Sequence, residues 1–309
     1  MRNAAIDAVR ELAKNDRNVV LISGDLGFGV LDMFRNEMPE QYFNAGICEQ
    51  NMSSMAAGMA LEGKRVYTYS IGNFPTLRCI EQIRNDICYH NANVTIMAVG
   101  GGFAYGSLGM SHHATEDIAI MRSLPNMRVF TPADAREAKM IVYKAAELES
   151  PCYIRLNKGG EPDIHQSNAE LEEYKIGQAI QLRKGQDICL MSAGAITIEA
   201  MKAAQVLEHQ GMKVTVYSFP CIKPIDSEVI KESVEKYKYI FTIEEHNVIG
   251  GFGSAVAEIM AEAGGGGKLV RIGLPDIYSS IVGSQSYLRH VYHMDSQAIV
   301  EKVIETVHG

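Results

Sequence analysis

Short apolar runs and longer stretches with helical spacing alternate along the first half of the chain. The apolar runs are rich in Val, Ile, Tyr and Thr and fall at residues 18–25, 64–70, 93–100, 127–132 and 151–156. Between them, apolar positions recur at helical spacing over residues 49–62, 75–89 and 133–149. Runs of the first kind predict strands, and strands that alternate with helices predict a largely parallel sheet covered by helices on both faces.

The alternation lapses in the middle of the chain and then returns. Residues 157–187 are polar, contain glycine and show weak periodicity, as is typical of a linker. Strands are then expected at 187–194, 213–220, 239–246 and 268–273, and helices at 195–210, 226–237, 250–264 and 295–307. We therefore predict an α/β protein with two domains, each a largely parallel sheet flanked by helices, at 1–160 and 187–309, joined by a linker at 161–186.

Composition narrows the class of protein without identifying it. The net charge is −8, whereas a nucleic-acid surface would need a basic patch, so no nucleic-acid partner is expected. The first helix lacks the continuous apolar core of a signal peptide, and no run approaches 18 uncharged apolar residues, so no membrane span is expected. The six cysteines are scattered without a C-x-x-C pair, which indicates reduced thiols and a cytoplasmic location.

Glu49 is distinctive because it is the first residue of a predicted helix that is otherwise rich in Ala, Gly, Met and Ser and looks fully buried. An apolar setting disfavours the charged form of a carboxyl, so its pKa should rise and let it hold a proton near neutrality. The alternative is an exposed acid in the first helical turn, where the helix dipole favours negative charge. The pattern alone leaves both interpretations open.

A glycine-rich loop at residues 100–117 carries His112 and His113, followed by Glu116. The two histidines could be acid/base groups or loop residues without a task. No metal site is predicted, because HHATED offers no second ligand pair at metal-binding spacing. The loop also lacks the Lys-Ser/Thr ending of a phosphate loop.

Rings and basic residues lie near expected strand ends. Tyr69 and Phe74 flank one such end, where a ring could stack on a flat heterocycle or simply belong to the core. Arg155 and Lys158 lie just past another, on the usual ligand side of an α/β sheet. They could bind phosphate or be solvated.

In their order along the chain, these segments resemble the C-terminal half of transketolase and of 1-deoxyxylulose-5-phosphate synthase. The resemblance runs through FNAGICEQ, YSIGNFPTLRCIEQIRNDI, the HHATED loop and YIRLNKG, and resumes at VYSFPCIKPID and IEEHNVIGGFGSAVAE. It covers essentially the whole chain and implies a pyrimidine-binding domain followed by a transketolase C-terminal domain.

The resemblance implies roles for most of the residues singled out. Glu49 would contact N1′ of the thiamine pyrimidine, so that the 4′-amino group can remove a proton from the thiazolium ring. Phe74 would stack on the pyrimidine, and Ile47 and Tyr69 are assigned to the same cofactor. His112 would face the substrate oxygen, with further substrate contacts assigned to His113, Arg155 and Lys158.

The other half of the family's site is missing from this sequence. That half binds diphosphate and Mg²⁺ through a Gly-Asp-Gly motif and a later Asn, whereas residues 23–29 read SGDLGFG. We therefore expect a naturally short chain that shares thiamine diphosphate with a partner subunit, which also holds the Mg²⁺, in an α2β2 complex. Asp25 resembles the family's early Asp near the subunit boundary, and Glu116 falls on a family acid.

Two departures from the family bear on substrate. Leu108 replaces an Asp that touches sugar hydroxyls, and Gly100 and Gly101 replace phosphate-binding residues. Each lost charged hydrogen bond is worth about 1.5–3 kcal/mol, and the glycines should leave space. The prediction is a two-carbon ketol transfer from a ketose or ketose phosphate to an aldose-type acceptor. The alternatives are a synthase-like enzyme, a 2-oxoacid dehydrogenase β-like chain and a non-catalytic regulatory partner.

Overall fold

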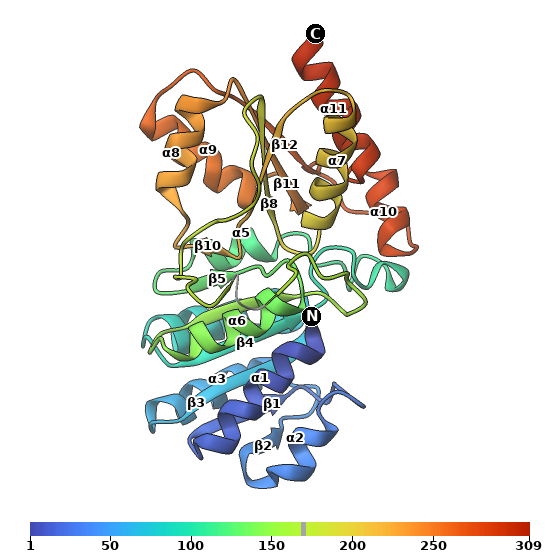
Figure 1. Cartoon of the computed structure of the whole chain (residues 1–309). Helices are drawn as coiled ribbons and strands as arrows, with labels where there is room; N and C mark the ends of the chain where they lie inside the picture. The colour runs from blue at the N-terminus through green and yellow to red at the C-terminus, as the bar shows by residue number, and fades with distance from the viewer. Residues whose placement is uncertain (168–170) are drawn as a thin grey trace.

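Two α/β domains are stacked along the long axis of the molecule in the computed structural model, which describes residues 1–167 and 171–309 (Figure 1). The first sheet has the strand order β10-β5-β6-β4-β3-β1-β2 and the second β12-β11-β8-β9-β7. Each is parallel except at one edge, where β10 pairs antiparallel with β5 and β7 pairs antiparallel with β9. The predicted fold class is confirmed.

The first sheet lies between two layers of helices. Its strands are β1 (Val19–Ser23), β2 (Tyr42–Asn44), β3 (Arg65–Ile71), β4 (Val94–Val99), β5 (Arg128–Phe130), β6 (Cys152–Leu156) and β10 (Cys221–Lys223). Helices α1 (Arg2–Asn15), α2 (Asp32–Glu37) and α6 (Ala135–Ala146) pack on one face. On the other lie α3 (Glu49–Leu61), α5 (Asp117–Ser123) and a continuous helical segment made of η2 (Leu77–Cys79), α4 (Ile80–Gln82) and η3 (Ile83–Cys88).

The second sheet is covered in the same way. Its strands are β7 (Ile180–Arg183), β8 (Ile188–Ala193), β9 (Val214–Ser218), β11 (Tyr239–Asn247) and β12 (Lys268–Leu274). Helices α7 (Thr197–His209), α10 (Gln285–Val291) and α11 (Ser296–His308) pack on one face, and α8 (Ser227–Lys236) and α9 (Phe252–Ala263) on the other. No helix in the described part of the chain is long and apolar enough to cross a membrane.

The sequence patterns do not reveal two short strands at the edges of the sheets. Strand β7 lies inside the predicted linker 161–186 and belongs to the second sheet, half-buried and therefore polar in composition. Strand β10 comes from the predicted second domain but completes the first sheet. Because β10 has three residues, it carries too little periodicity to be recognised.

Candidate active site

The central residues of the candidate site lie at the carboxyl ends of parallel strands, where ligands bind in open α/β sheets. Glu49 follows β2 and opens α3, Phe74 follows β3, and His112 lies in the loop that follows β4. Helix α3 packs against β3 and brings the Glu49 carboxylate to the end of that strand, where Ser70 Oγ is 3.4 Å from Glu49 Oε1.

Glu49 is buried, with 2% of its surface exposed, but its surroundings are not purely apolar. Arg78 Nη1 donates to Glu49 Oε2 at 2.7 Å. This ion pair corrects the expectation of an apolar pocket. Helix α3 is also not fully buried, because it buries Glu49, Met52, Ser53, Ala56 and Ala57 but leaves positions such as Gln50 and Ser54 exposed.

Phe74 is the centre of a small cluster of flat side chains. The Arg78 guanidinium carbon lies 4.6 Å from the centroid of the Phe74 ring. The His112 ring meets Phe74 edge-on, with centroids 5.2 Å apart. Asn73 Nδ2 donates to the carbonyl oxygens of His113 at 2.7 Å and Ser111 at 3.3 Å, which ties the histidine loop to the end of β3.

The two histidines have different environments. His112 is half-buried beside Ser111 Oγ, 3.1 Å from its Nδ1, and burial together with the neighbouring His113 lowers the pKa of His112. His113 is buried, with Nε2 3.1 Å from the Gly106 carbonyl and its ring against Phe103. His112 is therefore the more exposed of the two histidines, whereas His113 holds the loop through Nε2 and lines the hollow beside it.

A hollow of about 440 Å³ opens next to this cluster, and its lining includes Asn73, Leu77, Met110, His113 and Glu116 but not Glu49, Phe74 or His112. Glu116 is half-buried, and burial raises its pKa. The hollow supplies room for a ligand next to the histidine loop, in keeping with the family position that Glu116 resembles.

Tyr69 is not part of the cluster. It is 2% exposed and packs in the core between the sheet and the α1 and α6 layer, and burial raises its pKa to about 12. Successive side chains of a strand point to opposite faces, so the contact of Ser70 with Glu49 places Tyr69 on the far side. The predicted cofactor contact of Tyr69 is therefore wrong, and Tyr69 is a core residue.

Arg155 is also used within the fold. Its Nε donates to Asp117 Oδ2 at 2.8 Å, and its Nη2 donates to the carbonyl oxygens of Ala114 at 2.8 Å and Glu245 at 2.9 Å. The side chain is 6% exposed. Because this guanidinium is buried and bonded to protein groups, the predicted phosphate contact is replaced by a role in joining the domains.

Two other predicted residues remain on the surface. Lys158 is exposed, with its ammonium 5.3 Å from the centroid of the Tyr105 ring, and that ring lies 6.4 Å from His112. Ile47 is 74% exposed, two residues before Glu49. Both therefore lie at the rim of the cluster.

The space expected beside Gly100 and Gly101 is filled. A Cβ atom on Gly100 would lie 2.3 Å from Tyr105 Cδ2, and one on Gly101 would lie 2.8 Å from Arg155 Cγ. The glycines admit these two side chains to the loop, so they do not leave room for substrate. Leu108 is 53% exposed and does not line the hollow beside the histidine loop.

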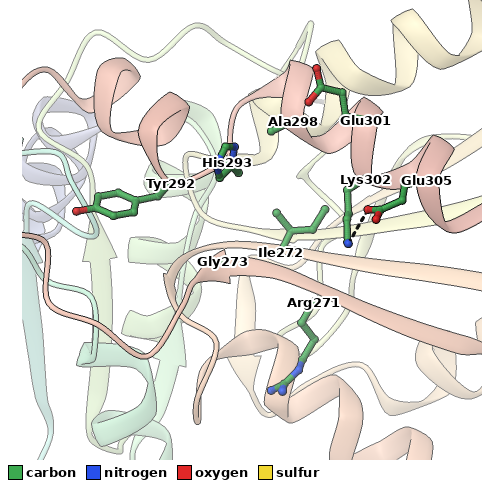
Figure 2. A pocket seen from close by; sticks show the side chains of 9 residues that line it. All are labelled: Arg271, Ile272, Gly273, Tyr292, His293, Ala298, Glu301, Lys302 and Glu305. Carbon is green, nitrogen blue, oxygen red and sulfur yellow. Dashed lines mark hydrogen bonds and ion pairs between the residues drawn. The ribbon is translucent and has the colours of Figure 1, made fainter.

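A separate hollow of about 500 Å³ lies in the second domain, where α11 faces β12 (Figure 2). Its charged side chains bond to protein groups: Lys302 donates to Glu305 at 2.8 Å (Figure 2). Arg271 donates to the Val248 carbonyl at 2.7 Å, and Glu301 accepts from Gln297 at 2.9 Å. Among residues 1–167 and 171–309, no group of three or more His, Cys, Asp or Glu side chains could hold a metal ion.

The Glu49 and Phe74 pair suits a flat, nitrogen-rich ring. The planar guanidinium of Arg78 already lies over Phe74 while it donates a hydrogen bond to Glu49. An aminopyrimidine has the same two properties, a flat face and nitrogen atoms at its edge. The residues present therefore fit the pyrimidine end of a thiamine cofactor.

Sequence reasoning missed Arg78. Arg78 lies within the segment that carries the family resemblance. However, an arginine four positions after Phe74 gives no sign in the sequence that its partner is the buried Glu49. The contact joins positions 29 residues apart and depends on how α3 and η2 meet.

Comparison with known proteins gives two family models that match the chain. The transketolase pyrimidine-binding domain matches residues 1–161, and the transketolase C-terminal domain matches residues 177–299. A relative from Methanocaldococcus jannaschii, described as a transketolase C-terminal section, is 37% identical over 306 residues, which are 99% of this chain and 95% of that protein.

Two further similarities concern proteins made of separate subunits. A relative from Actinobacillus succinogenes, described as one of the subunits of an apulose-4-phosphate transketolase, is 34% identical, and the match covers 97% of this chain and 96% of that protein. The solved structure of a split-gene transketolase, an inactive β4 tetramer, has a TM-score of 0.89 and 37% identity, and the match covers 98% of this chain and 97% of that chain. The predicted resemblance is confirmed.

Proposed function

The chain belongs to the transketolase family, and from that premise we propose that it is the pyrimidine-side subunit of a split transketolase. Its pyrimidine-binding domain implies thiamine diphosphate as the cofactor. The observation that carries the proposal is the buried carboxylate of Glu49, linked through Arg78 to the ring of Phe74. A carboxyl and a ring in this relation fit the edge and the face of an aminopyrimidine.

When bound, thiamine diphosphate supplies the carbon centre that carries a two-carbon ketol unit from donor to acceptor. Glu49 holds a proton at the pyrimidine N1′, shielded from water by its burial. Phe74 orients the flat ring, and Ile47 contacts the cofactor from the rim. His112, whose lowered pKa keeps it neutral at pH 7, accepts or returns a proton at a substrate hydroxyl.

The surroundings of the cluster support the proposed partner subunit. Large apolar side chains are exposed near Glu49, Arg78 and His112, among them Ile47 at 74%, Leu77 at 42% and Met110 at 55%. Exposed apolar surface of this kind favours a protein interface. We propose that a second chain covers it, binds the diphosphate, holds the Mg²⁺ through oxygen ligands, and pairs with this chain as α2β2.

The proposed substrates are a ketose or ketose phosphate donor and an aldose-type acceptor. His112 and Lys158 face them from the rim, and His113 keeps the loop in place. Arg155 and Lys158 are the two basic residues predicted to contact an anionic substituent of the substrate. Because Arg155 is bonded within the fold, the Lys158 ammonium is the one proposed for this contact. All six cysteines are free thiols, which supports the proposal that the protein is located in the reducing cytoplasm.

The test is reconstitution. The purified chain is mixed with the product of an adjacent reading frame that carries Gly-Asp-Gly and a later Asn, together with thiamine diphosphate, Mg²⁺ and a panel of ketose and ketose phosphate donors. Each chain alone should be inactive and the mixture should transfer ketol units. Turnover of a 2-oxoacid donor instead would indicate the synthase-like alternative, and cofactor binding without turnover of any donor would indicate a regulatory chain.

A further inference from the structure

Arg78 occupies a position that the proposed function reserves for the cofactor. Its Nη1 is 2.7 Å from Glu49 Oε2, and its guanidinium carbon is 4.6 Å from the centroid of Phe74. These are the two groups that should receive the edge and the face of the aminopyrimidine. A guanidinium and a pyrimidine are both flat and cannot occupy the same place at once.

Glu49 gives a physical reason for this contact in the free chain. The carboxylate is 2% exposed, and a buried charge without a partner is strongly destabilising. Its other side-chain contact is the longer one to Ser70 Oγ at 3.4 Å. Arg78 therefore supplies the compensating charge that keeps Glu49 buried before any ligand arrives.

The position of Arg78 allows it to leave. It lies in the short turn η2, and its side chain is 45% exposed while that of Glu49 is 2% exposed. A long side chain held at its tip by one partner and one ring can swing into solvent without disturbing the core. Cys79, the next residue, is buried and keeps the turn itself in place.

We propose that the Arg78 guanidinium occupies the pyrimidine position on Glu49 and Phe74 in the free chain. It must leave that position when thiamine diphosphate binds. Cofactor binding is then an exchange of one flat hydrogen-bonding group for another on Phe74 and Glu49. In the free subunit, Arg78 stabilises the fold by compensating the buried charge of Glu49. Because the cofactor must displace Arg78, the apparent affinity of the subunit for the cofactor is lower. This inference rests on the proposed function, because it takes Glu49 and Phe74 as the pyrimidine site.

The experiment measures thiamine diphosphate binding to the two-chain complex by calorimetry at saturating Mg²⁺. Arg78→Met removes the charge and the donors, and Arg78→Lys keeps the charge but loses the planar group. Arg84→Met is the matched control, because Arg84 is an exposed arginine of the same helical segment that pairs with Asn85. The thermal unfolding temperature of each free variant chain is measured alongside.

Arg78→Met should bind the cofactor about tenfold more tightly than the wild type, with Arg78→Lys in between and Arg84→Met unchanged. The free Arg78→Met chain should unfold at least about 3 °C lower, because Glu49 loses its partner. Weaker or unchanged cofactor binding in Arg78→Met would overturn the proposal, as would an unfolding temperature equal to that of Arg84→Met. Failure of the wild-type complex to bind thiamine diphosphate would overturn the proposed function instead.

Discussion

At the scale of single residues, the site depends on which side chains are buried and which can reach a ligand. Glu49 is buried and paired with Arg78, whereas His112 is half-buried and approached by Phe74 edge-on. His113, its neighbour in sequence, is used to hold the loop against Gly106. The two adjacent histidines therefore differ in burial and in hydrogen-bond partners.

The protonation state of His112 can be tested directly. Burial and the neighbouring His113 lower the pKa of His112 from its ordinary value of 6.5, so the ring should remain neutral through pH 6.5 and gain its proton only at lower pH. Titration of the imidazole carbon-bound protons by NMR should give a midpoint below 6.5, with His112→Asn used to assign the signal. A midpoint above 6.5 would contradict the role of a neutral acceptor at neutral pH.

Part of the candidate site could be proposed from the sequence. Glu49, Phe74 and His112 stand in one order within family motifs, and the structure brings Phe74 next to His112 and links it through Arg78 to Glu49. Tyr69 could have been excluded by strand alternation once Ser70 was placed on the Glu49 side. Arg155 and Arg78 could not have been assigned, because their partners Asp117, Glu245 and Glu49 come together only when separate elements pack.

At the scale of elements, helix α6 shows how a local motif positions a larger assembly. Asp134 accepts a hydrogen bond from the Glu137 N–H at 2.8 Å, and Glu137 accepts one from the Ala133 N–H at 2.7 Å. Asp134 thus caps one of the N–H groups that the helix start leaves without a partner, and Glu137 satisfies the N–H of the residue before the cap. Asp134 also accepts a hydrogen bond from the Ile164 N–H at 2.8 Å, which ties the chain beyond β6 to the helix.

Asp134→Ala should lower the free energy of unfolding by about 1–2 kcal/mol, the cost of losing a helix cap. The extra bond to Ile164 favours the upper end of that range. Urea unfolding followed by circular dichroism would measure it, with Glu149→Ala at an exposed position near the other end of α6 as the control. Equal stability of the two variants would show that the cap contributes nothing.

Long, buried elements were predictable and short edge elements were not. Strands β4 and β8 are buried along their whole length and mostly apolar, which the sequence pattern indicates directly. Strand β2 and strand β10 have three residues each, too few for a period to be read. The expected helix at 75–89 is found after Pro75 as the consecutive segments η2, α4 and η3, which run without a gap from Leu77 to Cys88.

At the scale of the whole molecule, a buried network of charges joins the two domains. Arg155 of the first sheet contacts Asp117 and the Glu245 carbonyl, and the Glu245 carboxylate accepts from Arg289 and from the Phe103 N–H. Glu244 and His246 flank this network on β11 and are fully buried. The domain junction is therefore polar.

Glu244 and His246 should make opposite contributions to the pH dependence of stability. Burial raises the pKa of Glu244 to about 7, although the N–H groups of Phe252 and Gly253 lower it. Folding then retains a proton that the unfolded chain releases, so this contribution is full below pH 4.5 and is lost as pH rises through 7. Burial lowers the pKa of His246 to about 4, so its contribution is full above pH 6.5 and is lost as pH falls.

The two slopes oppose each other between the ordinary pKa values of 4.5 for Glu244 and 6.5 for His246. Glu244→Gln should therefore make stability rise with pH over this interval, by up to about 1.4 kcal/mol per pH unit relative to the wild type. Urea unfolding at several pH values would measure the change. Parallel curves for the variant and the wild type would show that Glu244 does not titrate on folding.

The central claim for the whole molecule is that Glu49 serves a cofactor ring shared with a partner chain. The most direct test is the turnover number of the reconstituted two-chain complex with Glu49→Gln, beside the control Glu62→Gln at the exposed far end of the same helix. Glu49→Gln should reduce turnover by at least about 100-fold while Glu62→Gln leaves it unchanged. Full turnover by the Glu49→Gln complex would contradict the account.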